Sequence, residues 1–271
     1  MKYTINMEKF KSNPYNFNNT EITSDDVLNI LKNLNIQNYT IHNLSLFQRA
    51  FVHTSYCHMK DYKEYTRPEN CLPLYDQSYE TLEFLGDSFL GCIITKYLYN
   101  RFVLLHNQNE GFLTKLKIRF VCGEQLAFLS KQLGFHKYMI LSKHIDENCS
   151  GRNSIHILED IYEAFIGALY LDCNDYSIIE QFIINSIETY IDIADVILND
   201  NNYKDQLLRY YQHNFKIYPK YVTTKDENTN TFQCNIYKGD DYIISGTGNT
   251  KKKSEQNASK LALISYRVMS E

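Results

Sequence analysis

Residues 79–90 read Tyr-Glu-Thr-Leu-Glu-Phe-Leu-Gly-Asp-Ser-Phe-Leu, and this stretch decides the interpretation of the first part of the chain. Its apolar residues recur at helical spacing, which predicts an amphipathic helix over about 79–101. Glu83 and Asp87 lie four residues apart, so they project from one face of that helix. Because neighbouring carboxylates repel each other, the pair is either a solvated surface or one half of a cation site.

Gly86 lies between these two acids. A glycine inside a helix costs about 1 kcal/mol relative to alanine and often marks the close approach of another group. The sequence therefore favours a second element packed directly against this helix.

A second apolar segment, residues 157–172, also carries two acids on one face. Asp160 and Glu163 lie three residues apart in a helix too apolar for a surface position, so we expect them to be half-buried. Buried carboxylates need either a basic partner or a divalent cation held by oxygen ligands. Together with Glu83 and Asp87 they would supply four oxygen donors for Mg²⁺, which can activate water and bind a phosphodiester.

The composition is that of an ordinary globular protein. Of 271 residues, 44% are hydrophobic and 22% are charged, which excludes a wholly disordered or fibrous chain. The sequence contains no apolar run of eighteen residues and no secretory signal pattern. Its seven cysteines are scattered without a C-x-x-C pair, which predicts reduced thiols in a cytoplasmic protein.

Two folded parts are expected, with a mainly helical domain at residues 25–198. We predict a poorly ordered extension over 1–24, a loop insertion over 58–78 and a polar linker over 199–202. The clearest predicted helices of the first domain are 46–57, 79–101, 111–133, 154–172 and 176–198.

Residues 203–271 have a different pattern, which predicts a small α+β domain of order α-β-β-β-α. The expected elements are a helix over 203–214, strands over 220–225, 231–238 and 242–247, and a helix over 251–268. This part carries a net charge of +4 and the remainder −8, which indicates a basic binding module beside an acidic domain.

Glu80 through Asp87 closely resembles the signature of the ribonuclease III family, usually written N-E-R-L-E-F-L-G-D. Three other stretches also match, in the order along the chain that the family has, and together the matches span about residues 26–198. They are His53-Thr54-Ser55, Glu110 through Lys117, and Leu158 through Asp172. The resemblance implies a helical endonuclease domain.

The resemblance also assigns the site residues. The four metal-site acids of that family fall on Glu83, Asp87, Asp160 and Glu163, the same acids that the spacing singles out. Asp87 and Glu163 are implied to be the most critical for catalysis.

Other residues are implied to have lesser roles. Glu80 and Glu110 match acids that support RNA or subunit contacts, although both could be ordinary surface carboxylates. His53 matches a structural helix end, so we do not expect it to act as a base. The sequence departs from the family at Tyr79 and Thr81, where Asn and Arg are usual.

By the same resemblance, the activity is Mg²⁺-dependent cleavage of double-stranded RNA, and Mn²⁺ can substitute for Mg²⁺. The family acts as a homodimer and leaves 5′-phosphate and 3′-hydroxyl ends. A rival interpretation is a non-catalytic protein that sequesters duplex RNA on the same fold. Inactive relatives generally lose an acid from the metal set, and this chain retains all four, which favours the enzyme over that rival. An unrelated helical phosphohydrolase would not explain the second domain.

Residues 248–262 resemble the last helix of a double-stranded RNA-binding domain. Lys251, Lys252 and Lys253 would open that helix, where the dipole and the side chains both attract phosphate. Leu208-Arg209 stands where the family often has Gln-Glu, and its Gly-Pro-x-His loop is replaced near 228–231. These departures predict weaker or differently registered binding of duplex RNA.

Overall fold

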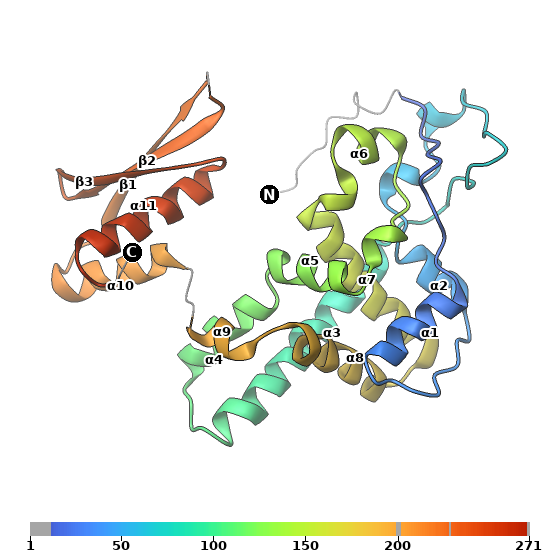
Figure 1. The fold of residues 1–271 in the computed structure, drawn as a ribbon, viewed down its shortest axis with the longest axis horizontal. Coiled ribbons are helices and arrows are strands. Elements are labelled where there is room, and N and C mark those ends of the chain that lie inside the picture. Colours follow the sequence, from blue (N-terminus) through green and yellow to red (C-terminus); the bar gives the residue numbers. More distant parts are fainter. Residues whose placement is uncertain (1–11, 199–201, 228, 270–271) are drawn as a thin grey trace. The chain divides into compact units, whose positions relative to one another are not determined.

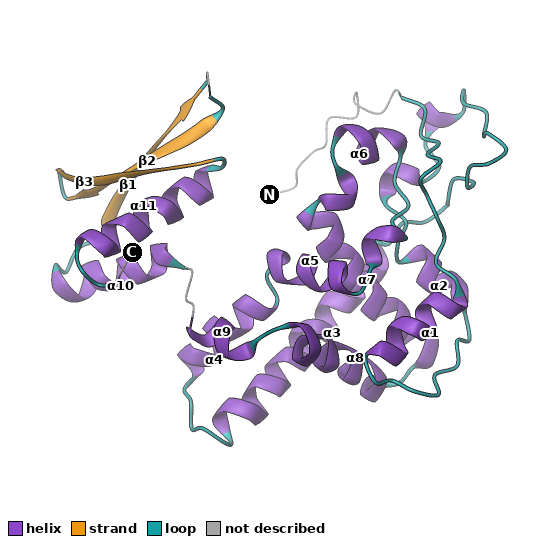
Figure 2. Ribbon diagram, viewed as in Figure 1, coloured by secondary structure: helices purple, strands orange, loops and turns teal. Residues whose placement is uncertain are grey.

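The computed structural model describes residues 12–198, 202–227 and 229–269, which form two compact units that divide after Val196 (Figure 1). The first unit is helical, and the second contains the sheet (Figure 2). Both predicted fold classes are therefore confirmed. None of the described helices is long and apolar enough to cross a membrane, and all seven cysteines are free thiols.

The first unit is built around α3 (Glu80–Leu98) and α7 (Ile155–Cys173), which pack side by side. Most residues of α7 are buried, because α3, α5 and α8 surround it. The remaining helices are α1 (Ser24–Asn33), α2 (Leu44–Arg49), α4 (Glu110–Phe120), α5 (Gly123–Gln132), α6 (Lys143–Asn148), α8 (Tyr176–Tyr190) and α9 (Ile193–Leu198). Short 3₁₀ turns lie at Thr54–Tyr56, Lys60–Tyr62, Phe135–Lys137 and Gly151–Asn153, and a π turn at Tyr99–Val103 continues α3.

The predicted helix over 111–133 is two helices, α4 and α5. The break falls at Cys122, whose backbone is extended with φ −77° and ψ 150°. The predicted helix over 176–198 is likewise broken, at Ile191, into α8 and α9. Neither break coincides with a proline, and the apolar residues keep their helical spacing across both. The sequence pattern therefore predicted one continuous helix in each case.

The prediction of poor order before residue 24 was wrong for residues 12–23. Asn16 and Asn19 are buried, and both side-chain amides donate hydrogen bonds to the Leu141 carbonyl, at 3.2 and 2.9 Å. The Asn19 side-chain oxygen accepts in return from the Leu141 backbone N–H at 3.1 Å. Side chains that suggested a solvated extension therefore hold this segment on the domain, whereas residues 1–11 lie outside the described part.

The predicted insertion over 58–78 is a loop with one short 3₁₀ turn. It is anchored by its own small core, in which Tyr62, Cys71 and Leu74 pack with residues of the helical unit. The loop is therefore a packed part of the domain.

The second unit has the predicted α-β-β-β-α order. Its elements are α10 (Tyr203–Asn214), β1 (Pro219–Asp226), β2 (Thr231–Lys238), β3 (Asp241–Gly248) and α11 (Lys251–Ser265). The strands form an antiparallel sheet in the order β1-β2-β3, and both helices cover one face of it (Figures 1 and 2). Alternate residues of β2, Cys234 and Ile236, enter the core between sheet and helices.

Of the predicted linker, residues 199–201 lie outside the described part. Asn202 is described as the N-cap of α10, where its side chain accepts a hydrogen bond from the Asp205 N–H.

Candidate active site and nucleic-acid surface

Two glycines bring the backbones of α3 and α7 into contact. A Cβ atom on Gly86 would lie 1.8 Å from the carbonyl oxygen of Glu163, and one on Gly167 would lie 2.2 Å from that of Leu82. No side chain larger than hydrogen fits at either position without separating the helices. The close approach expected at Gly86 is therefore confirmed, and its partner is the helix with the second acidic pair.

This contact brings the four predicted acids together. Burial, with the charge of Asp87 as the next contribution, raises the pKa of Glu163 to about 8. Burial and the charge of Asp160 raise the pKa of Glu83 to about 7. Each acid pair therefore lies within electrostatic reach of the pair on the other helix.

The four acids differ in depth. Glu163 is buried at 8% exposure, Glu83 and Asp160 are half-buried, and Asp87 is exposed. The four acids therefore extend from the interface of α3 and α7 to the protein surface.

The one basic side chain recorded beside this cluster in the described part of the chain is His156, whose Nδ1 lies 3.8 Å from Glu159 and whose charge lowers the pKa of Asp160. Within the described residues, no lysine or arginine forms an ion pair with any of the four acids. Carboxylates without a lysine or arginine partner are chemically compatible with a divalent cation held by oxygen ligands.

The donor set suits a hard divalent cation, because it consists of carboxylate oxygens alone. Across the described parts of the chain, however, no three His, Cys, Asp or Glu side chains converge in a way that could hold a metal ion. The helix backbones are fixed by the glycine contacts, so convergence requires rotation of the acidic side chains.

Glu159 is an additional acid that the sequence did not single out. Its charge contributes to the raised pKa of both Glu83 and Glu163, and its own pKa is raised by burial and by Asp160. It packs over Gly123, where a Cβ would lie 2.4 Å from its carboxylate. Its position next to Asp160 was the available signal.

Glu80 and Glu110 are placed differently. Glu80 lies near the cluster, because its charge helps to raise the pKa of Glu83 and Asp160. Glu110 is exposed at the start of α4 and accepts a hydrogen bond from Thr114 at 2.7 Å. It is not among the charges that raise the pKa of Glu83, Asp160 and Glu163.

His53 caps a 3₁₀ turn. Its Nδ1 accepts a hydrogen bond from the Ser55 N–H at 3.1 Å, and burial lowers its pKa to about 4. A histidine held in this way stays neutral, in agreement with the structural role expected for it.

In the second unit, the three predicted RNA-binding lysines form the first turn of α11. Lys251, Lys252 and Lys253 are all exposed, and Thr250 caps the helix by accepting from the Lys253 N–H at 3.2 Å. Three side-chain charges and a helix N-terminus therefore face solvent together, which suits phosphate.

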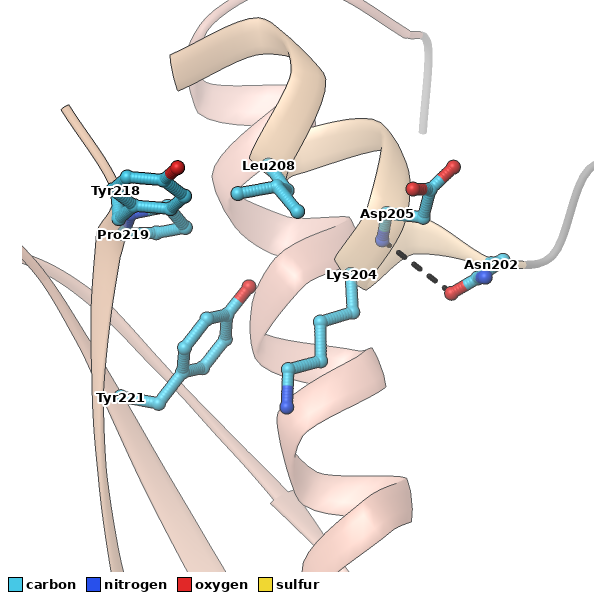
Figure 3. Close-up of a pocket in the computed structure, with 7 residues that line it drawn as sticks. All are labelled: Asn202, Lys204, Asp205, Leu208, Tyr218, Pro219 and Tyr221. Carbon is cyan, nitrogen blue, oxygen red and sulfur yellow. Dashed lines mark hydrogen bonds between the residues drawn. The ribbon is translucent and has the colours of Figure 1, made fainter. Parts of the chain in front are cut away.

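Leu208 and Arg209, which depart from the family pattern, both lie on α10, and Figure 3 shows the surroundings of Leu208. Leu208 lines a pocket with Tyr218 and Pro219. Arg209 pairs with Asp205 at 2.9 Å on the same helix. This helix surface thus offers an apolar side chain and a compensated charge in place of an amide and a carboxylate.

The comparisons with known proteins match both units. The model of the family described as ribonuclease III domain matches residues 80–174, and that of the double-stranded RNA binding motif matches residues 203–266. A probable ribonuclease 3 of Acanthamoeba polyphaga mimivirus is 33% identical over 258 residues, which cover 93% of this chain and 47% of that protein. The ribonuclease 3 of Borreliella burgdorferi is 32% identical over 236 residues, covering 86% of this chain and 88% of that protein.

The chain therefore spans about half the length of the mimivirus relative and most of the bacterial one. Among solved structures, the nuclease domain of ribonuclease III from Campylobacter jejuni aligns with a TM-score of 0.49 and 21% identity. That alignment covers 63% of this chain and 97% of that domain.

Proposed function

The chain belongs to the ribonuclease III family of endoribonucleases, and from this premise we propose that it is a Mg²⁺-dependent, homodimeric nuclease that cuts double-stranded RNA. The observation that carries the proposal is the acidic cluster across α3 and α7, whose four acids form no ion pair with a lysine or arginine among the described residues. A protein that only sequesters RNA has no need to retain four mutually repelling carboxylates.

The residues that would hold the cation are Glu83, Asp87, Asp160 and Glu163. When bound, Mg²⁺ supplies an activated water and charge compensation for the phosphodiester. Glu163 lies deepest and Asp87 is exposed, so Asp87 is the acid best placed to face the RNA backbone. We assign the most critical roles to these two acids, and we propose products with 5′-phosphate and 3′-hydroxyl ends.

The test is cleavage of a long, end-labelled RNA duplex by the full chain, with Mg²⁺ and with EDTA. A single strand of the same sequence is the control. We expect duplex products only with Mg²⁺, and their ends can be identified by phosphatase treatment and ligation. Tight duplex binding without cleavage in either Mg²⁺ or Mn²⁺ would establish the sequestering protein instead.

An exposed aromatic residue beside the acids supports the homodimer. Phe84 is 77% exposed although it lies on α3 directly after Glu83. Phe84 lies in the second turn of α3, beside the acidic cluster, so a subunit that packed there would cover its ring. We propose that this surface contacts the same surface of a second copy, as twofold symmetry requires. Light scattering at assay concentrations should give the mass of a dimer, and a monomer that cleaves at full rate would contradict this proposal.

The lysines of α11 provide a test of RNA binding. In a Glu163→Gln background that prevents cleavage, replacing Lys251 and Lys252 by alanine should weaken duplex binding and reduce the salt dependence. If both contact phosphates, the slope of log K against log salt should fall by about 2. Gel-shift titration at several salt concentrations measures both quantities.

A matched pair, Lys32→Ala and Lys131→Ala, removes the same charge from exposed sites of the first unit. The variant with both Lys251 and Lys252 replaced should bind duplex RNA more weakly than the variant with both Lys32 and Lys131 replaced. Equal losses in both would show that net charge, and not the first turn of α11, governs binding.

A further inference from the structure

Tyr79 forms a direct link from the start of α3 to one of the acids on α7. Its side chain is only 3% exposed, and its hydroxyl donates a 2.8 Å hydrogen bond to Oδ2 of Asp160. A buried phenol that donates to a half-buried carboxylate fixes both groups in one relative orientation.

The ring has little freedom to move away from this position. The Tyr79 backbone N–H donates to the Val52 carbonyl at 2.9 Å, and its own carbonyl accepts from Leu82 and Glu83 at 2.8 and 2.9 Å. The His53 ring packs against it, with centroids 5.9 Å apart. The direction of the hydroxyl is therefore set by the backbone and by packing before any substrate or cation arrives.

This contact takes up one oxygen of Asp160 and leaves Oδ1 for another partner. Asp160 is a proposed ligand, and the hydrogen bond to its Oδ2 limits rotation of the carboxylate, so Tyr79 determines the direction in which Oδ1 points. Position 79 is also where the sequence departs from the family signature.

We propose that Tyr79 is a positioning residue that orients the Asp160 carboxylate so that its second oxygen is presented to a divalent cation. The assignment rests on the proposed function, because it presupposes that Asp160 is a ligand. It adds to that function a residue that touches neither the cation nor the RNA.

The test is the affinity of the full chain for Mn²⁺, measured by electron paramagnetic resonance in the absence of RNA. Tyr79→Phe keeps the ring and removes only the hydroxyl, and it should weaken Mn²⁺ binding by about 10-fold to 100-fold, as loss of an orienting partner typically does. Tyr62→Phe is the matched control. Its side chain is also 3% exposed, and its hydroxyl donates at 3.1 Å to a backbone carbonyl, that of Ser55.

A double-mutant cycle separates positioning from a general effect on the fold. In an Asp160→Ala background, Tyr79→Phe should cause no further loss of Mn²⁺ affinity, because the group that it orients is absent. A full additional loss in that background would overturn the assignment, as would wild-type Mn²⁺ affinity in Tyr79→Phe or an equal loss in Tyr62→Phe.

These outcomes are distinct from failure of the proposed function. If the wild type binds Mn²⁺ and cleaves duplex RNA while Tyr79→Phe binds equally well, only the role of Tyr79 is lost. If the wild type neither binds Mn²⁺ nor cleaves, both proposals are overturned.

Discussion

Replacing Glu163 by glutamine should lower the rate of duplex cleavage by more than about 100-fold. Loss of a residue that merely orients a metal ligand costs about 10-fold to 100-fold, and loss of a ligand itself should exceed that range. Glutamine keeps the size of the side chain, so packing at the interface of α3 and α7 is preserved. Single-turnover cleavage of an end-labelled duplex measures the effect.

The fold of this variant should remain intact. Burial and the charges of Asp87, Glu159, Glu83 and Asp160 raise the pKa of Glu163, so the neutral amide removes repulsion from the folded state. We therefore expect a melting temperature at least equal to that of the wild type at pH 8, and unchanged affinity for duplex RNA. Glu147→Gln, on the exposed surface of α6, is the control and should cleave normally. Near-normal cleavage by Glu163→Gln would remove Glu163 from the site.

The second large effect is expected from Gly86→Ala. In an exposed helix this change would stabilise the protein by about 1 kcal/mol. Here the new methyl group meets the Glu163 carbonyl at 1.8 Å, so the helices must move apart. Overpacking of this kind typically costs 1–3 kcal/mol and occasionally more. We expect the melting temperature of the helical unit to fall by roughly 5–10 °C, together with a loss of cleavage.

Gly91→Ala is a control on the same helix. The nearest atom to a Cβ at Gly91 is the flexible Lys117 Nζ, at 3.9 Å, so this variant should be as stable as the wild type or slightly more stable. Calorimetry of both variants gives the comparison. Equal stability of the two would show that α3 and α7 are not held together by backbone contact.

Much of the fold could be predicted from the sequence, because the spacing of its apolar residues changes from helical to alternating where helices give way to strands. The alternation in 231–238 matches β2 in full, and Gly239-Asp240 marks the turn after it, where Gly239 has a φ of 64° in the structure. The break at Ile191 could not be predicted, because no glycine or proline marks it and the apolar spacing continues across it, whereas Gly123 beside Cys122 was a signal that the apolar spacing concealed. The packing of Asn16 and Asn19 was equally hidden, since an asparagine that hydrogen-bonds a distant carbonyl looks like one in solvent.

The composition of the site was largely predictable, and its geometry was not. Spacing placed Glu83 with Asp87 and Asp160 with Glu163, and the structure shows that the two pairs influence each other's protonation. The sequence gives no distance between two helices, so the participation of Glu159 and the hydrogen bond from Tyr79 required the structure. The metal-binding role of the four acids stays a prediction.

The backbone contact at Gly86 and Gly167 also determines how the protein will lose its site on heating. A pocket on loops can open while the rest of a domain stays folded, but here the helices that carry the acids form the centre of the core. Amide hydrogens around Glu163 should then exchange only through global unfolding of the unit, among the slowest in the chain. Thermal inactivation and unfolding of the helical unit are in that case a single cooperative event, and residual activity after heating directly reports the folded fraction.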